Sequence, residues 1–338
     1  MFRNNLQRTG VFNTKGVLQA PKSIGKFKTG GMIQSSPVIV DGVAYFGSCD
    51  DHLYALDINT GKDKWSFSTE KYVFSTPAIF NGVAYFGSND RHLYAVDILT
   101  GAEKWRFATG GNVKSSPAVY DGLVYFGSWD ENFYAVDAVT GKERWRFKTE
   151  DGIDSSPAIS DGLLYFGSWD NHLYALDVQT GQEKWRFKTG GNIMSSPAVN
   201  DGMVFFGNND CDFFAVDIKT EKERWKISTN GKITSSAAVL DGAVYFGSGD
   251  GYLYAVESIT GQVKWRFKAE GWVHSSPAIA DGVVYFGSWD KHLYAVNIQT
   301  GQELWRFKTE DLVESSPAVS DGVVYIGSWD GTLYALRG

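Results

Sequence analysis

Carboxylates recur through this chain at a fixed spacing of 40 residues, which is a pattern that could bind cations. The alternative is that each aspartate caps its own turn by accepting backbone N–H groups. We favour turn capping, because every copy carries the same local motif around its aspartate. The column consists of Asp50, Asp90, Asp130, Asp170, Asp210, Asp250, Asp290 and Asp330.

Four histidines share a second column, and imidazole is a common metal ligand. His172 and His292 lie too many repeats apart to join the others at one ion, and His52 and His92 have no evident third ligand. We therefore expect no metal site. Serine, histidine and aspartate are all plentiful, but we interpret the repeated Ser-Ser-Pro as strand architecture and assign no catalytic residue.

Two variable columns are the better candidates for binding. The first holds tryptophan in copies three, four, seven and eight, so any site there would have two opposed halves. Exposed indoles indicate a partner site; alternatively, each indole folds over the loop of the next copy. This column reads Cys49, Asn89, Trp129, Trp169, Asn209, Gly249, Trp289 and Trp329.

The second variable column directly precedes a serine that is constant in all copies. Its variety would suit an asymmetric ligand, although drift at solvated positions would produce variety as well. The column reads Gln34, Phe74, Lys114, Asp154, Met194, Thr234, His274 and Glu314. The candidate binding residues are Trp129, Trp169, Trp289, Trp329, Phe74, Lys114, Asp154, Met194, His274 and Glu314.

The elements that position these columns follow from a β-hairpin that recurs seven times. In the copy Ala135–Trp145, Asp-x-x-Thr-Gly forms a tight turn, and Ala135 should lie opposite Trp145. The alanine leaves room for the indole to lie flat. The aligned tryptophans are Trp65, Trp105, Trp145, Trp185, Trp225, Trp265 and Trp305.

Each copy parses into four strands. In the third copy these are residues 113–120, 123–128, 133–137 and 143–148, and Asp121-Gly122 is a two-residue hairpin turn. A period of 40 indicates a repeat architecture. We predict an all-β, eight-bladed β-propeller of four-stranded antiparallel blades over residues 24–338. The last copy lacks its fourth strand, which residues 24–30 should supply, and residues 1–23 should pack outside the array.

Composition excludes several classes. The net charge is −7, which argues against general affinity for nucleic acid or an anionic bilayer. No apolar run is long enough to span a membrane, and the first residues lack the apolar core of a signal peptide. Cys49 and Cys211 fall on opposite sides of a closed ring, so both should be free thiols. We expect a monomer.

The run from Gly167 to Trp185, Gly-Ser-x-Asp-x-x-Leu-Tyr-Ala-x-Asp-x-x-Thr-Gly-x-x-x-Trp, resembles the pyrroloquinoline-quinone (PQQ)-like propeller repeat. That family includes quinoprotein dehydrogenases, the propeller lipoprotein of the outer-membrane β-barrel assembly machine (BamB), and bacterial sensor domains. The resemblance implies a tryptophan-docking role for the seven aligned tryptophans. Two departures stand out: Gly25 replaces the tryptophan, and Glu221 replaces the turn glycine.

The resemblance leaves three functions open. The first is a non-catalytic binding or scaffold propeller that presents one face and the channel mouth to a protein or small ligand. The second is a PQQ-dependent dehydrogenase with calcium, but those enzymes commonly carry adjacent cysteines and long insertions, which this chain lacks. The third is an amplified or engineered repeat protein without specific activity. The resemblance favours an extracytoplasmic location, and under the first reading no cofactor is expected.

Overall fold

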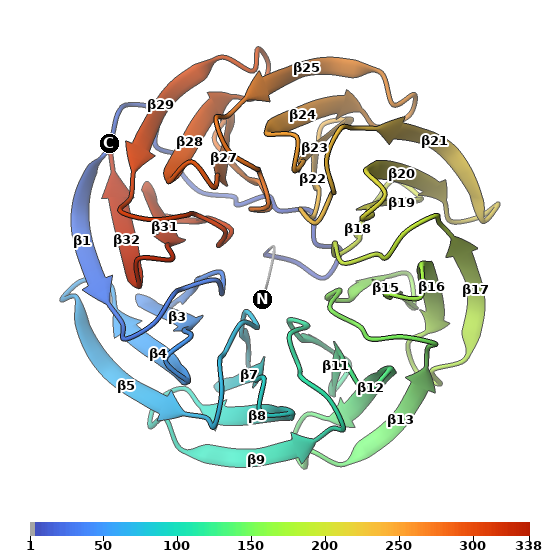
Figure 1. Cartoon of the computed structure of the whole chain (residues 1–338). Helices are drawn as coiled ribbons and strands as arrows, with labels where there is room; N and C mark the ends of the chain where they lie inside the picture. The colour runs from blue at the N-terminus through green and yellow to red at the C-terminus, as the bar shows by residue number, and fades with distance from the viewer. Residues whose placement is uncertain (1–3) are drawn as a thin grey trace.

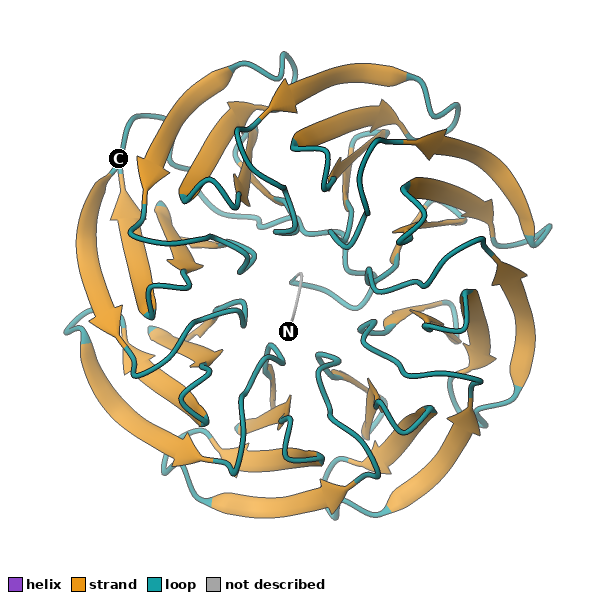
Figure 2. Cartoon of the chain, in the orientation of Figure 1, coloured by secondary structure: helices purple, strands orange, loops and turns teal. Residues whose placement is uncertain are grey.

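The computed structural model describes residues 4–338, and these form a closed ring of eight four-stranded antiparallel sheets (Figure 1). The predicted all-β eight-bladed propeller is confirmed. Figure 2 shows only strands and loops. Within residues 4–338 no helix is long and apolar enough to cross a membrane.

The strands nearest the channel are three residues long. They begin later than predicted, because the preceding Ser-Ser-Pro residues bond to neighbouring blades. These inner strands are β2 (Val38–Val40), β6 (Ala78–Phe80), β10 (Ala118–Tyr120), β14 (Ala158–Ser160), β18 (Ala198–Asn200), β22 (Ala238–Leu240), β26 (Ala278–Ala280) and β30 (Ala318–Ser320).

The two middle strands of each blade carry the buried core. The first are β3 (Val43–Gly47), β7 (Val83–Gly87), β11 (Leu123–Gly127), β15 (Leu163–Gly167), β19 (Met203–Gly207), β23 (Ala243–Gly247), β27 (Val283–Gly287) and β31 (Val323–Gly327). The second are β4 (His52–Asp57), β8 (His92–Asp97), β12 (Asn132–Asp137), β16 (His172–Asp177), β20 (Asp212–Asp217), β24 (Tyr252–Glu257), β28 (His292–Asn297) and β32 (Thr332–Arg337). Their apolar residues pack between adjacent blades, which explains why both faces of these strands are apolar.

The outer strands alternate exposed and half-buried residues, as expected for a charged edge. They are β5 (Lys62–Ser68), β9 (Glu103–Ala108), β13 (Glu143–Lys148), β17 (Glu183–Lys188), β21 (Lys222–Ser228), β25 (Val263–Lys268), β29 (Glu303–Lys308) and β1 (Lys22–Lys28). We number the blades along the chain: blade 1 is β2–β5, and blade 8 combines β30, β31, β32 and β1. The pairing of β1 with β32 confirms the predicted closure.

A belt of hydrogen bonds runs around the channel and closes on itself. The amide of Ser116 donates to Oγ of Ser156 at 2.9 Å, and the amide of Ser316 donates to Oγ of Ser36 at 3.0 Å, across the seam. The equivalent bond joins every adjacent pair of blades. The constant serine before each belt residue has its own architectural role, as we expected: the hydroxyl of Ser115 donates to the carbonyl of Ser155 in the next blade at 3.0 Å. The belt itself fixes where each inner strand begins.

The outer hairpins have the predicted register, with Ala135 opposite Trp145. Each docking tryptophan reaches into the next blade: Trp105 donates its indole N–H to the carbonyl of Ala138 at 3.1 Å, and its ring lies against Gly141. A Cβ on Gly141 would come within 2.7 Å of that ring, so glycine is required for space as well as for its φ of +68°. Glu221, which replaces this glycine in blade 5, adopts a φ of +60°, a conformation that is strained for a residue with a side chain.

The N-terminal segment does not pack outside the array, and that prediction was wrong. Leu6, Gln7, Thr9 and Gly10 accept backbone hydrogen bonds from the inner strands of blades 4 to 7. The segment then passes behind the blades to the rim (Figure 1), where Val17 accepts the indole N–H of Trp305 at 2.7 Å. Inner strands expose unpaired backbone groups toward the channel, and an extended segment satisfies them.

Candidate functional site

One end of the channel is lined by the two variable columns together, and we call this ring the mouth. It consists of the lip column (Gln34, Phe74, Lys114, Asp154, Met194, Thr234, His274 and Glu314) and the loop column (Cys49, Asn89, Trp129, Trp169, Asn209, Gly249, Trp289 and Trp329). The lip side chains are all half-buried rather than solvated. Contacts between the columns therefore decide what the mouth can bind.

Constant residues hold both columns in place. The serine belt fixes the lip column, because each lip residue lies two positions before a residue whose amide donates to the next blade. Lys114, for example, precedes Ser116. The aspartate column fixes the loops: Asp130 accepts from the amide of Asn132 at 3.1 Å, the hydroxyl of Tyr134 at 2.8 Å and the amide of Gly110 at 2.6 Å. The aspartates thus tie neighbouring loops together, as turn caps do.

Blades 3 and 4 form one pole of the mouth. The Lys114 ammonium lies 4.3 Å from the centre of the Trp129 ring and 5.1 Å from that of Phe74, both within cation–π range. The Trp129 indole donates to Asp154 and packs on Trp169 with ring centres 5.2 Å apart. Burial raises the pKa of Asp154, and Lys114 followed by the indole N–H groups opposes that rise.

Blades 7 and 8 form the opposite pole with the same order of groups: a base, an indole, a carboxylate and an indole. His274 stacks on Trp289 with ring centres 4.8 Å apart, and Trp289 packs on Trp329 at 5.9 Å. Burial lowers the pKa of His274 to about 4, and nearby Lys232 lowers it further. The base at this pole is therefore neutral at pH 7.

Glu314 occupies the position at this pole that Asp154 holds at the other. It accepts from the amide nitrogen of Gln34 at 3.1 Å, which joins blade 8 to blade 1. Burial raises the pKa of Glu314, while Gln34, Trp329 and Lys114 oppose the rise. Each pole thus holds one carboxylate that is removed from water and bordered by indoles.

The sectors between the poles are neutral. Phe74 packs edge-on against Tyr72, and Met194 Sδ lies 3.3 Å from the amide nitrogen of Asn209. Burial, followed by the nearby acids, raises the pKa of Cys49 to about 12, so this thiol is a poor nucleophile. Cys49 and Cys211 are both free thiols, as predicted.

Several polar atoms of the mouth are buried without a hydrogen-bond partner. Such atoms are rare in folded proteins and each costs about 1–3 kcal/mol, so a cluster of them points to a bound ligand or ordered water. The indole N–H groups of Trp169 and Trp329 lie close enough to Asp154 and Glu314 to oppose the rise in their pKa values, but they do not reach hydrogen-bond geometry. The unpartnered atoms are the Nε1 atoms of Trp169, Trp289 and Trp329, Nε2 of His274, and Oδ1 of Asn89 and Asn209.

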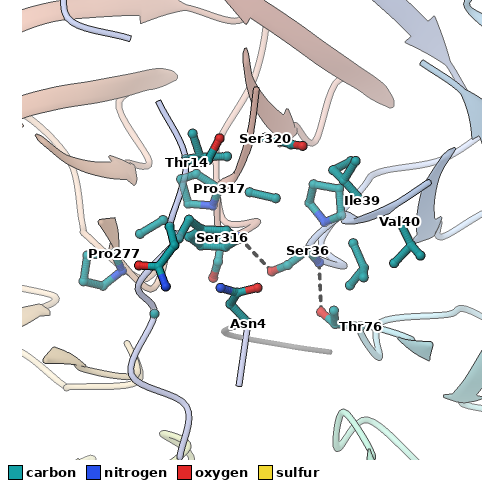
Figure 3. A pocket seen from close by; sticks show the side chains of 18 of the residues that line it. Asn4, Thr14, Ser36, Ile39, Val40, Thr76, Pro277, Ser316, Pro317 and Ser320 are labelled. Carbon is teal, nitrogen blue, oxygen red and sulfur yellow. Dashed lines mark hydrogen bonds between the residues drawn. The ribbon is translucent and has the colours of Figure 1, made fainter. Parts of the chain in front are cut away.

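The channel contains a second recess that the sequence gave no reason to expect. A cavity of about 520 Å³ lies between the N-terminal segment and the inner strands of blades 7, 8, 1 and 2 (Figure 3). Asn4 and Thr14 line it on one side, and Ser36, Thr76 and Ser316 on the other. The segment covers blades 4 to 7, which leaves this sector of the channel open.

Arg8 anchors the N-terminal segment in the channel. Its side chain is fully buried, and its guanidinium donates to the backbone carbonyls of Pro157 and of Ser116, the latter at 3.0 Å. Arg8 is one of two arginines before the repeats, and an arginine there is the one sequence signal that could have placed this segment inside the ring. Arginine suits the place because its planar fork bonds several carbonyls at once.

The histidine column does not form a site. His172 Nδ1 lies 3.0 Å from the carbonyl oxygen of Asp170 in its own loop, and His92 has the same local contact with Asp90. Among residues 4–338 no group of three histidine, cysteine, aspartate or glutamate side chains is placed to hold a metal ion.

A sequence model of the family described as outer membrane protein assembly factor BamB matches residues 12–131, 130–235 and 214–338. The chain belongs to this family. The PQQ-like resemblance seen in the repeats is thereby confirmed. A comparison with curated protein sequences finds no significant match.

Solved structures share the architecture at low identity. BamB from Moraxella catarrhalis is 18% identical with a TM-score of 0.83, covering 94% of this chain and 100% of its own. The computationally designed Ika8 protein is 19% identical with a TM-score of 0.83, covering 96% and 100%. A europium-containing methanol dehydrogenase is 15% identical with a TM-score of 0.86, covering 100% and 97%. These likenesses show the fold alone.

Proposed function

We propose that this BamB-family chain is a non-catalytic binding propeller whose mouth takes a small polar ligand or the polar side chains of a protein partner. The observation that carries the proposal is the cluster of buried, unpartnered polar atoms in the mouth. Indole and imidazole N–H groups there would donate to a ligand, and two asparagine oxygens would accept from it. Amides, carboxylic acids and peptide groups offer both functions.

The arrangement of the poles supports an asymmetric ligand. Lys114 already stands beside the carboxylate of one pole, whereas the other pole has neutral His274 in the equivalent place. A ligand bound across the mouth would therefore meet opposed ends of different charge. Such variation, carried on a constant backbone, is how a repeat protein gains a binding site without changing its fold.

The dehydrogenase reading is less well supported by the residues present. A quinone with calcium would need a cluster of oxygen ligands beside it, and among residues 4–338 no three histidine, cysteine, aspartate or glutamate side chains form such a cluster. The two cysteines lie in blades 1 and 5. We therefore propose binding without a cofactor. Adding PQQ and calcium and assaying dye reduction tests this directly, and turnover would overturn the non-catalytic proposal.

Location follows the family. BamB is described as an outer membrane protein assembly factor, so we propose that this chain works outside the cytoplasm. The net charge of −7 is in keeping with a protein partner rather than nucleic acid.

The binding proposal is tested by NMR of the indole N–H groups in ¹⁵N-tryptophan-labelled protein. Probes are free amino acids, short amides and mono- and dicarboxylic acids. A ligand of the mouth should shift the signals of Trp169, Trp289 and Trp329 and leave the docking tryptophans unchanged. Trp289→Phe and Trp329→Phe should weaken that ligand at least about tenfold, the value of one good hydrogen bond.

Trp272→Phe is the matched control, because Trp272 is half exposed and stacks on Trp289 with ring centres 4.9 Å apart, so phenylalanine removes an indole N–H and keeps a ring in that stack. It should leave the affinity unchanged. If no probe and no peptide shifts the mouth signals, the proposal fails, and the chain is better described as a repeat protein without specific activity.

A further inference from the structure

The closing blade differs from the other seven at one position that shapes its outer surface. Where seven blades carry a docking tryptophan, β1 of blade 8 carries Gly25. Gly25 pairs with Ala335 in the register that Trp145 shares with Ala135. The backbone of the docking position is therefore intact, and only the side chain is absent.

The other blades show what an indole does at this position. Trp65 lies against the turn glycine of the next blade, Gly101, and donates to the carbonyl of Ile98 at 2.8 Å. It also packs on Tyr45 of its own blade, with ring centres 5.9 Å apart. The equivalent groups around Gly25 are Gly61, the carbonyl of Ile58 and Tyr325.

These groups line a cavity of about 40 Å³, which we call the seam slot. A Cβ on Gly61 would meet no atom within 4 Å, whereas one on Gly101 would come within 2.9 Å of the Trp65 ring. Ala335 is partly exposed, although the equivalent alanines of the other blades are fully buried. The seam slot is lined by Gly25, Leu56, Ile58, Gly61, Tyr325 and Ala335.

We propose that the seam slot binds a free planar heteroaromatic molecule of the indole class. Apolar cavities left by a missing side chain bind compounds that match the lost group, and seven blades define the group that fits here. The Ile58 carbonyl provides the acceptor for the ring N–H. The ring would extend past the enclosed volume into solvent, as the part-exposed docking tryptophans Trp65 and Trp105 do.

A tryptophan side chain of another protein is excluded as the occupant. In the other blades the indole enters from its own outer strand, so a foreign tryptophan would need backbone where β1 already runs. A free compound carries no backbone and meets no such conflict. The inference does not depend on the mouth, which lies at one end of the channel and not on the rim.

The test is thermal unfolding of the full chain with indole. At about ten times its Kd, indole should raise the Tm of the wild type by about 2 °C. Gly25→Trp, which fills the seam slot covalently, should raise the Tm by itself and abolish the response to indole. 1-Methylindole, which has no N–H, should bind more weakly than indole.

Trp265→Gly is the positive control, because it opens an equivalent slot between blades 6 and 7 beside Gly301 and the carbonyl of Ile298. Indole should partly restore its Tm. Ala335→Leu is a second block of the seam slot, for use if Gly25→Trp does not fold. The proposal is overturned if indole rescues Trp265→Gly but leaves the wild type unchanged, or if it acts equally on the wild type and on a blocked variant.

Discussion

The rim and the mouth of this propeller both carry tryptophans, but their indole N–H groups differ in hydrogen bonding. At the rim, Trp65, Trp105, Trp225 and Trp265 donate to carbonyls of the next blade. In the mouth, three of the four indoles are buried without an acceptor. The comparison teaches that the same side chain serves the fold where its polar atom is satisfied and suits a ligand where it is not.

Each set has a member that departs from the rule. Trp145 at the rim has a buried N–H without a partner, and Trp129 in the mouth donates to Asp154. Trp129 also lies beside Lys114, so at this pole the indole N–H and the face of the ring already have partners within the protein. The opposite pole, with neutral His274, leaves more of its hydrogen-bonding capacity for a ligand.

The largest expected effect is on the rim. Trp225→Ala should lower the free energy of unfolding by about 3–5 kcal/mol, because it removes a buried ring and a satisfied hydrogen bond. Trp169→Ala, which removes a half-buried ring with no hydrogen bond, should cost about 1–2 kcal/mol. Urea unfolding of both variants measures the difference, and equal losses would mean that the mouth tryptophans are structural.

A pH effect should distinguish the two poles. The folded-state pKa of His274, about 4, lies below the unfolded value of about 6.5, so its contribution to stability is complete above pH 6.5 and is lost as the pH falls toward 4. His274→Phe keeps a ring on Trp289 but does not titrate. Between pH 7 and pH 4.5 the wild type should lose about 2 kcal/mol more than this variant.

The matched substitution at the other pole is Lys114→Met, which keeps His274 and its contribution to the pH dependence but removes the charge that opposes the raised pKa values of Asp154 and Glu314. Glu314, whose pKa is raised, contributes with the opposite sign: its stabilisation is present at low pH and declines as the pH rises. Since Glu314 is present in both the wild type and His274→Phe, it cancels from the comparison. Parallel slopes for these two proteins would contradict the assignment.

The smallest effect concerns one turn of the rim. Glu221→Gly should stabilise the protein by roughly 0.5–1 kcal/mol, because glycine adopts the φ of +60° without strain. This net figure already allows for the larger conformational entropy of glycine in the unfolded state, which opposes folding. The substitution also removes a Cβ from the place where other blades hold a docking ring: a Cβ on Gly181 would come within 2.5 Å of Trp145. A fall in stability would show that Glu221 makes a compensating contact.

Repetition decides which features the sequence makes predictable. The pairing of Ala135 with Trp145 and the closure of β1 on β32 follow from an unbroken period and from the strand that the last copy lacks. The path of residues 4–17 was not predictable in the same way, because these residues match no repeat and Arg8 bonds to backbone carbonyls, which have no sequence signature. The column pattern identified the lip and the loop residues, but only the folded loops bring His274 onto Trp289 and Lys114 onto Trp129.

The central claim, that rim indoles hold the fold and mouth indoles do not, is tested most directly by one pair of conservative variants. Trp225→Phe and Trp289→Phe each keep an aromatic ring and remove one indole N–H, and their free energies of unfolding in urea are compared with that of the wild type. The account predicts a clear loss for Trp225→Phe, about 1–2 kcal/mol, and little or none for Trp289→Phe. An equal loss in both, or a larger loss for Trp289→Phe, would contradict it.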